Sequence, residues 1–301
     1  MKIIVIGSFK LEPDQKKRLE LLGEVSYLQD TKESKEKALT QLADFDIICS
    51  ESKPIANIIY DLKDKLISFP FVGVGFLDLK KLTNNNVRVA NAPGCNKAAV
   101  SEWILGMMII LSRKLLKYIG IKEIGENDFL EEMPGLAGKK VAILGKGNVG
   151  SRVGRICEAF DMQVAYFEKG DNILQSTQGA DCTINCLANN QETKGLLGKE
   201  FFEALKNKSF FVSITDTEIY DVDALIDAMD SGHLAGAAID PAGIGIFNPK
   251  GDVYKKLKNN PKILTTPHIS FHTDMTERVA NDIMIDNIEA WAKNKPINLV
   301  N

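Results

Sequence analysis

The ten residues VAILGKGNVG, from Val141 to Gly150, decide the fold. Four apolar residues predict a buried strand, and a helical apolar pattern follows at 149–160. Between them stands GxGxxG: Gly145 permits the tight turn, Gly147 lets the backbone approach a diphosphate, and Gly150 lets helix and strand pack closely. Free N–H groups and the dipole at the helix start favour a phosphate. The predicted dinucleotide contacts are Gly145, Gly147, Asn148, Val149 and Gly150.

A glycine-rich turn that binds nothing is the alternative, and the complete strand–turn–helix context argues against it. The next strand, 164–167, runs into Glu168, 23 residues after the first glycine. An acid at this distance accepts hydrogen bonds from the adenosine ribose and repels a 2′-phosphate, so it favours NAD(H) over NADP. Lys169 beside it weakens that preference, and a solvent-facing glutamate is the plainer alternative. Cys186, at the end of strand 182–186, is a further candidate cofactor contact.

Strands and helices alternate on both sides of this stretch, which is typical of parallel sheets. Before it, we expect strands at 3–6, 47–49, 71–74 and 87–90, and helices at 13–22, 34–42 and 55–63. After it, we expect strands at 164–167, 182–186, 210–214, 237–239 and 263–265, and helices at 199–205, 222–229 and 276–293. A long apolar helix at 98–117 and a polar segment at 120–138 separate the two series. The pattern predicts an α/β protein with two doubly wound parallel-sheet domains and an inter-domain cleft.

Composition narrows the function classes. The 301 residues are 45% apolar and 26% charged, and the formal net charge is −3, so nothing favours nucleic acid or an anionic membrane surface. Five cysteines without a CxxC pair argue against a disulfide framework or a metal site and fit a reducing compartment. The amino terminus has a strand pattern rather than a signal peptide, and the densest apolar run, 103–111, is too short to span a bilayer. We therefore expect a cytoplasmic protein.

Further motifs occur in a fixed order: NAPGCN at 91–96, LAGKKVAILG at 136–145, ETKGL at 192–196, LAGAAID at 234–240 and TPH at 266–268. Together they resemble the D-isomer-specific 2-hydroxyacid dehydrogenases over nearly the whole chain. The resemblance implies an NAD-dependent oxidoreductase that acts on a small 2-hydroxy or 2-keto acid. It also implies a flavodoxin-like substrate domain, 1–97 plus 276–301, a Rossmann NAD-binding domain, 98–275, and a homodimer formed through 98–138.

The resemblance implies roles for individual residues. His268, 28 residues after Asp240, matches the general acid/base that moves a proton to or from the substrate oxygen. Asp240 matches the aspartate that holds the nicotinamide carboxamide. The backbone that would bind the substrate carboxylate comprises Gly73, Val74 and Gly75. A structural histidine at a strand end is the alternative for His268; His233 and His272 are interpreted as surface residues, although His272 could stand in at the cleft edge.

Two positions depart from that family. Asp216 stands where the resemblance places an arginine that grips the substrate, and Gly245 stands where it places the glutamate partner of the histidine. In a reworked dehydrogenase, Asp216 could replace that glutamate and raise the pKa of His268. Lys53 or Lys97 could then supply a cation for the substrate. The protein could instead bind NAD(H) as a redox sensor or regulator without turnover, or act on an amine or a polyol, which an acidic side chain suits better.

Overall fold

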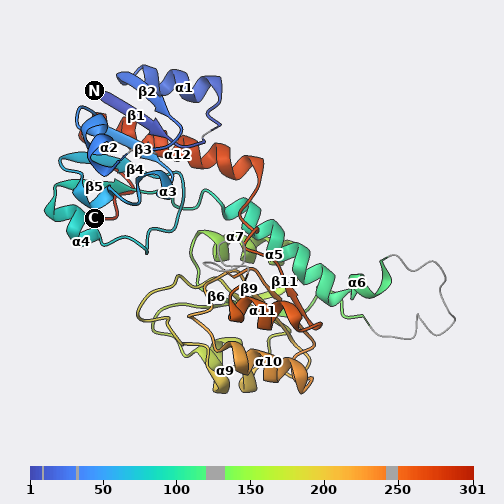
Figure 1. Ribbon diagram of the computed structural model, residues 1–301. Coiled ribbons are helices and arrows are strands. Elements are labelled where there is room, and N and C mark those ends of the chain that lie inside the picture. Colours follow the sequence, from blue (N-terminus) through green and yellow to red (C-terminus); the bar gives the residue numbers. More distant parts are fainter. Residues whose placement is uncertain (9, 32–33, 120–132, 242–249) are drawn as a thin grey trace. The chain divides into compact units, whose positions relative to one another are not determined.

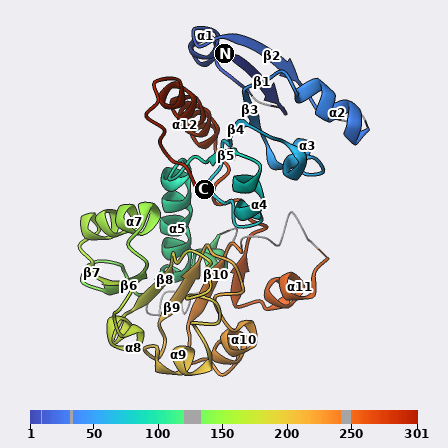
Figure 2. The same ribbon diagram turned by 90° about the vertical axis from the view of Figure 1, so that its left-hand side faces the viewer.

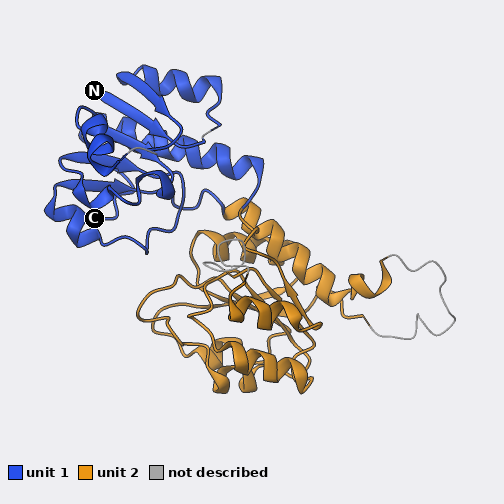
Figure 3. Cartoon of the chain, viewed as in Figure 1, with its two compact units in different colours: residues 1–96, 272–301 blue, residues 97–271 orange. Residues whose placement is uncertain are grey.

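Parallel strands form two separate sheets in this chain, and helices cover both faces of each sheet (Figure 1). The computed structural model describes residues 1–8, 10–31, 34–119, 133–241 and 250–301. The chain divides into two compact units, which Figure 3 colours separately. Unit 1 comprises Met1–Asn96 and His272–Asn301, and unit 2 comprises Lys97–Phe271. The α/β class with two parallel sheets, expected from the sequence, is confirmed.

The bounds of the units differ slightly from those expected for the domains, 1–97 with 276–301 and 98–275. Lys97 is the first residue of helix α5 (Lys97–Ser112), whose buried side chains pack in unit 2. The segment from His272 leads into α12 (Asp274–Ala292), which contributes Met284, Ile285 and Ile288 to a core of unit 1. Lys97 therefore belongs to unit 2 together with α5, and the segment from His272 belongs to unit 1 together with α12.

Unit 1 contains a five-stranded parallel sheet in the order β2-β1-β3-β4-β5. Its strands are β1 (Lys2–Ile6), β2 (Glu24–Leu28), β3 (Ile47–Ser50), β4 (Lys65–Ser68) and β5 (Val87–Ala90). Besides α12, its helices are α1 (Pro13–Glu20), α2 (Lys35–Leu42), α3 (Ser52–Ile55), the 3-10 turn η1 (Ile59–Asp61) and α4 (Leu79–Asn84). β3 and β4 are buried on both faces, as strands covered by helices on both sides must be. This strand order is that of flavodoxin-like sheets.

Unit 2 contains a six-stranded parallel sheet in the order β11-β10-β9-β8-β6-β7. Its strands are β6 (Lys140–Leu144), β7 (Gln163–Phe167), β8 (Cys182–Asn185), β9 (Phe210–Ser213), β10 (Gly236–Ile239) and β11 (Ile263–Thr265). Besides α5, its helices are α6 (Leu115–Tyr118), α7 (Asn148–Ala159), α8 (Ile173–Thr177), α9 (Lys199–Ala204), α10 (Val222–Asp230) and α11 (Asp252–Asn259). Figure 2 shows α5 and α7 on one face of this sheet and α8 to α10 on the other. Consecutive residues of a strand point to opposite faces of the sheet and pack in different cores: Val212 packs on the α5 side and Phe211 on the α9 side.

Several expected elements are wrong in position or extent. The stretch 71–74, expected as a strand, lies in a loop; the observed strand is β4, whose four residues are all buried. The helix expected at 55–63 is replaced by α3 and η1. The helix expected at 98–117 ends at Ser112, because Lys114 adopts a positive φ of 48° that separates α5 from α6. β2 was not expected, because this edge strand lacks an apolar run.

All five cysteines are free thiols. No helix in the described ranges is long and apolar enough to cross a bilayer. Within the same ranges, no group of three or more His, Cys, Asp or Glu side chains is arranged to hold a metal ion.

Candidate functional site

The six parallel strands of unit 2 end along one edge of their sheet, and the candidate residues of this unit follow them there. In the spatial order of the strands from β7 to β11, these residues are Glu168, Gly145, Cys186, Asp216, Asp240 and His268. Neighbouring strands lie about 4.8 Å apart, so the turn at Gly145 and Asp240, three strands away, are separated by roughly 14 Å along the edge. Residues far apart in the sequence thus form one row.

The strand order reverses at β6, which makes its carboxyl end a topological switch point, where α/β sheets bind ligands. Gly145 turns the chain there with φ 94°, and a Cβ at this position would lie 3.1 Å from the carbonyl oxygen of Cys186, just after β8. A Cβ at Gly150 would lie 2.0 Å from the carbonyl oxygen of Gly145. The tight turn and the close approach of α7 to β6 therefore both require glycine.

Helix α7 begins without a side-chain cap. Its N-cap residue is Gly147, and a Cβ there would meet no atom within 4 Å, so the backbone is open to an approaching group. The N–H groups of a first helical turn have no partner within the helix, and Asn148 and Val149 belong to this turn. An open glycine next to such donors provides the backbone surface that a diphosphate needs.

An open cavity of about 430 Å³ lies beside this helix start. Its lining comprises Lys97, Lys146, Gly147, Asn148, Ser151 and Arg155. Three of these side chains are cationic and none is acidic, so the potential in the cavity attracts a negatively charged group. Lys97, considered above as a cation for the substrate, is placed here at the glycine turn. Sequence reasoning did not single out Lys146, Ser151 or Arg155, although Lys146 lies within the GxGxxG motif, Ser151 directly follows it and Arg155 lies in the helix that it opens.

Glu168, the expected ribose acceptor, faces a lysine. Nζ of Lys146 lies 3.6 Å from Oε1 of Glu168 and 4.8 Å from the centroid of the Tyr166 ring. The neighbouring Lys169 instead pairs with Glu192, at 2.6 Å between Nζ and Oε1. Both side chains of the Lys146–Glu168 pair are about half exposed, so they can reorient to meet a ligand. The lysine that forms an ion pair with Glu168 is thus Lys146 rather than the adjacent Lys169.

Cys186 follows the buried end of β8. Burial raises the pKa of its thiol to about 12, so the group is a neutral part of the site near neutral pH. Just before it, the amide of Asn185 donates to Oγ1 of Thr215 at 2.8 Å and to Oγ of Ser213 at 3.3 Å. All three of these polar side chains are buried. Because this network joins the ends of β8 and β9, it fixes the backbone that leads into Asp216.

Asp240 directly follows β10 and is fully buried. Its Oδ1 accepts hydrogen bonds from Oγ1 of Thr266 and from the backbone N–H of Ile269 at 2.9 Å. Its Oδ2 accepts from the backbone N–H of Ser270 at 2.8 Å. The carboxylate thus binds the turn that follows β11, and His268 lies at the middle of that turn.

His268 adopts an unusual backbone conformation for a residue other than glycine, with φ 61°. Its ring lies edge-on to Phe271, with 5.1 Å between the ring centroids. Burial lowers the pKa of His268 below its ordinary value, and the negative charges of Asp240 and Asp216 act in the opposite direction. The structure therefore brings both carboxylates close enough to influence this histidine. Gly245, where the resemblance places a glutamate, lies outside the described residues.

The substrate-binding candidates belong to unit 1. Gly73, Val74 and Gly75 lie in the loop after β4, and a Cβ at either glycine would meet no atom within 4 Å. Lys53 is an exposed residue of α3, directly after the neighbouring strand β3. Both segments thus follow the carboxyl ends of adjacent strands in the flavodoxin-like sheet.

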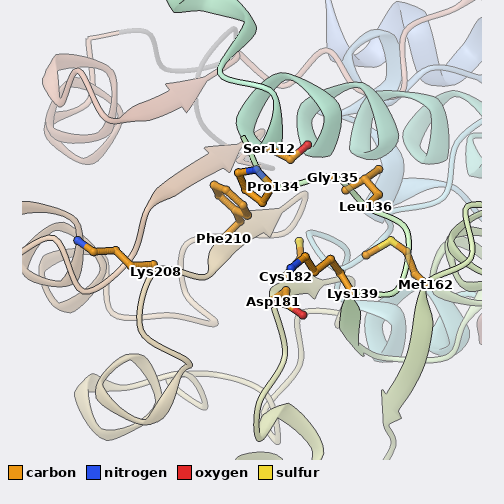
Figure 4. Close-up of a pocket in the computed structure, with 10 residues that line it drawn as sticks. All are labelled: Ser112, Pro134, Gly135, Leu136, Lys139, Met162, Asp181, Cys182, Lys208 and Phe210. Atoms are coloured by element: carbon orange, nitrogen blue, oxygen red, sulfur yellow. The ribbon is translucent and has the colours of Figure 1, made fainter. Parts of the chain in front are cut away.

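A second, smaller cavity of about 50 Å³ occurs in unit 2 (Figure 4). Cys182 and Phe210, the first residues of β8 and β9, line it together with Lys139, which precedes β6. These residues lie at the amino ends of the strands, whereas the glycine turn and His268 lie at the carboxyl ends. The small cavity is therefore separate from the candidate site.

Comparison with known proteins decides the family. A family model described as "D-isomer specific 2-hydroxyacid dehydrogenase, NAD binding domain" matches residues 105–270. The chain belongs to the D-isomer-specific 2-hydroxyacid dehydrogenases. It is 26% identical over 250 residues to a hydroxyphenylpyruvate reductase from Plectranthus scutellarioides, with 78% of this chain and 77% of that protein covered.

Solved structures with the same fold cover the whole chain. One is described as an acyclic imino acid reductase in complex with NADPH and D-Arg, with TM-score 0.82, 20% identity and 100% of both chains covered. Another is a D-lactate dehydrogenase with NAD+ from Lactobacillus jensenii, with TM-score 0.77, 21% identity and 100% of both chains covered. At these identities the likeness establishes the two-sheet fold and nothing finer.

The glycine turn, Asp240 and His268 stand where the resemblance places the family's residues, and Asp216 stands at the position expected for arginine. Arginine and aspartate have opposite charges, so this position carries an anion in place of the expected cation. The same anion lies where it opposes the lowering of the His268 pKa by burial. The departure thus places a negative charge near the histidine where the resemblance expects a positive one.

Proposed function

We propose that this protein is an NAD(H)-dependent oxidoreductase with an atypical active site, which transfers hydride between nicotinamide and a small 2-hydroxy or 2-keto acid. The supporting observation is the row of residues along the carboxyl edge of unit 2. From β7 to β11, the row runs from a ribose acceptor through a phosphate turn to a histidine. This is the order in which the parts of an extended dinucleotide and a reacting substrate have to follow one another.

The glycine turn fits the cofactor on the geometry of this chain. Gly145 and Gly150 have no room for a side chain, and Gly147 leaves the backbone open. The backbone N–H groups at the start of α7, including those of Asn148 and Val149, would donate to the diphosphate. Cys186 and Asp240 would flank the nicotinamide end of the site. When bound, the nicotinamide ring supplies or accepts the hydride.

His268 carries the proton in this proposal. In the direction of reduction, the protonated imidazole donates to the carbonyl oxygen of the substrate; in oxidation, the neutral imidazole accepts the proton from the hydroxyl group. Asp216 serves as its partner in place of the glutamate and favours the protonated form. The backbone of Gly73, Val74 and Gly75 binds the substrate carboxylate, with Lys53 as the added cation.

NAD(H) is the proposed cofactor, and NADP(H) is disfavoured because Glu168 would repel a 2′-phosphate. Lys146, at 3.6 Å from Glu168, reduces that repulsion. The discrimination between the two cofactors is therefore expected to be modest, and it should depend on both members of this pair.

The assembly we propose is a homodimer formed through residues 98–138, in the cytoplasm and without a nucleic-acid or membrane partner. The described part of this range supports it, because Leu116 and Ile119 are 60% and 68% exposed. Exposed apolar side chains of this kind are candidates for a surface that another chain covers. The five free thiols fit a reducing compartment.

A second candidate function is hydride transfer to an imine, or from an amine. The specific observation that favours it is Asp216, because a carboxylate attracts a cationic nitrogen where arginine would attract an anion. A neighbour of the same fold is described as an imino acid reductase in complex with D-Arg. A third possibility, NAD(H) binding for sensing or regulation without turnover, follows from the loss of the arginine.

One assay separates these candidates. The purified protein is incubated with NADH and a panel of 2-keto acids, each with and without an added amine, while NADH absorbance is followed. Oxidation with a 2-keto acid alone supports the dehydrogenase, and oxidation that requires the amine supports the imine reductase. NADH binding in a calorimetric titration, without oxidation on any member of the panel, would overturn both enzymes in favour of the sensor.

A further inference from the structure

The turn that carries His268 is tied to a buried carboxylate on the neighbouring strand. Asp240, at the end of β10, accepts hydrogen bonds from Oγ1 of Thr266 and from the N–H groups of Ile269 and Ser270. These donors precede and follow His268 in the chain, so the carboxylate bridges the two ends of the turn. The contacts are local in space but span 26 to 30 residues in sequence.

The conformation of His268 requires such an anchor. A φ of 61° is unfavourable for a side chain with a Cβ, and backbone strain of this kind persists only where the surroundings over-determine it. The two N–H groups that Asp240 binds belong to the residues directly after the histidine. The bond to the Ile269 N–H fixes the peptide group directly after His268, and the bond to Thr266 holds the chain before it, so together they constrain this φ and hence the direction in which the imidazole leaves the backbone.

We propose that Asp240 is the positioning residue for His268, acting through the backbone of the turn at 266–270 rather than through contact with a bound molecule. The proposal rests on the proposed function, in which His268 moves the proton. It differs from the role that the family resemblance implies for Asp240, the binding of the nicotinamide carboxamide. Its support is that both carboxylate oxygens are directed to donors of this chain and that the residue is fully buried.

The negative charge of Asp240 also affects the pKa of His268, independently of the hydrogen bonds to the turn. Asp240 acts on His268 electrostatically, ahead of Asp216, and both carboxylates raise its pKa against the lowering caused by burial. One residue thus sets the geometry of the histidine and contributes to its proton affinity. A purely structural hydrogen-bond acceptor would do the first without the second.

Asp240→Asn tests the proposal in the full-length protein. The amide cannot accept at both positions, so the exchange of the Ile269 and Ser270 amide protons, followed by NMR, should accelerate by about tenfold or more. The pKa of His268, read from its imidazole resonances among only three histidines, should fall. The dissociation constant for NADH should change by less than about threefold, whereas a carboxamide role predicts weakening by about tenfold or more.

Two further variants complete the test. Asp221→Asn removes another carboxylate that binds two backbone N–H groups, at the start of α10, and should leave the turn around His268 and the pKa of His268 unchanged.

Thr266→Val removes one donor to Asp240 and keeps the negative charge, so it tests the turn even where Asp240→Asn does not fold. The Ile269 amide should exchange faster in this variant. Unchanged exchange at Ile269 and Ser270 in both variants of the turn, or loss of NADH binding in a folded Asp240→Asn protein, would overturn the proposal. Because exchange and imidazole titration need no substrate, this outcome is separate from a failure to find turnover.

Discussion

Lys146 and Glu168 form an ion pair with 3.6 Å between Nζ and Oε1, and this pair joins the glycine turn to the end of the next strand. Lys146 stands at the first variable position of GxGxxG, and Glu168 stands at the position proposed to contact the adenosine ribose. A 2′-phosphate would meet an anion and a cation together rather than an anion alone. We therefore expect the pair, rather than the glutamate alone, to set the preference between NAD(H) and NADP(H).

Lys146→Ala should shift the preference further toward NADH. Loss of one charge interaction near 4 Å in exposed surroundings is worth about 1 kcal/mol, so NADPH binding should weaken about fivefold relative to NADH. Glu168→Gln should shift the ratio in the opposite direction. Fluorescence titrations with both cofactors measure the ratio. Lys169→Ala is the matched control, because Lys169 pairs with Glu192; an equal shift in this variant would refute the specific role of Lys146.

The two glycines of the turn should respond differently to alanine. A Cβ at Gly150 would lie 2.0 Å from the carbonyl oxygen of Gly145, so Gly150→Ala should lower the free energy of unfolding by about 1–3 kcal/mol or more. Gly147→Ala has open space and should cost only about 0.5–1 kcal/mol, the loss of a glycine N-cap. It should still weaken NADH binding by about tenfold or more, because the methyl group occupies the approach of the diphosphate.

Gly198→Ala is the control for Gly147→Ala. Gly198 is also an N-cap, at the start of α9, and a Cβ there likewise meets nothing within 4 Å. Thermal unfolding should show similar small losses for the two variants, and calorimetry should show normal NADH affinity only for Gly198→Ala. Equal NADH affinity in both would mean that the diphosphate does not bind at this turn.

The pH dependence of reduction should report the carboxylates around His268. Reduction needs the protonated imidazole, so the rate falls as pH rises through the pKa of His268, which burial places below its ordinary value of 6.5. Asp216→Asn removes a negative charge that raises this pKa, so the falling limb of kcat should move to lower pH. Asp216→Arg should move it further; unchanged or improved turnover in that variant would show that Asp216 is no partner of His268.

The buried network before Asp216 should contribute to stability. Thr215→Val leaves the amide of Asn185 without its 2.8 Å acceptor, so unfolding should become easier by about 1–3 kcal/mol. Thr183→Val is the isosteric control on β8, since its buried Oγ1 has no hydrogen-bond partner among the described residues, and it should be neutral or stabilising. Equal denaturation midpoints for the two variants would contradict a role for this network.

The elements of this chain that could be predicted from its sequence are those specified by residues close together in the sequence. Strand, turn and helix adjoin one another around Gly145, so the motif specifies its own structure over ten residues. The strands of unit 2 carry short apolar runs, and these predict their positions. The edge strand β2 is half exposed, and the apolar loop after Pro70 resembles a strand as closely as β4 does, so periodicity alone misplaces both.

The contacts between residues of the candidate site could not be predicted from the sequence, because they join residues that are distant in sequence. Lys146 meets Glu168 only because β6 and β7 are neighbours in the sheet. Asp240 could be matched to the family from its motif, but its hydrogen bonds to the turn around His268 depend on the pairing of β10 with β11. Sequence reasoning therefore named many of the residues and gave little of their geometry.

The most direct test of the central claim is a comparison of NADH oxidation by the wild-type protein and His268→Gln on the panel of 2-keto acids, with NADH affinity measured in parallel. The account predicts turnover by the wild type with at least one member, and a loss of about 10²- to 10⁴-fold in kcat in His268→Gln with nearly unchanged NADH affinity. His233→Gln is the control, because His233 precedes the amino end of β10 and so lies away from the carboxyl edge of the sheet. It should behave as the wild type. Wild-type turnover that survives in His268→Gln, or bound NADH that no substrate oxidises, would contradict it.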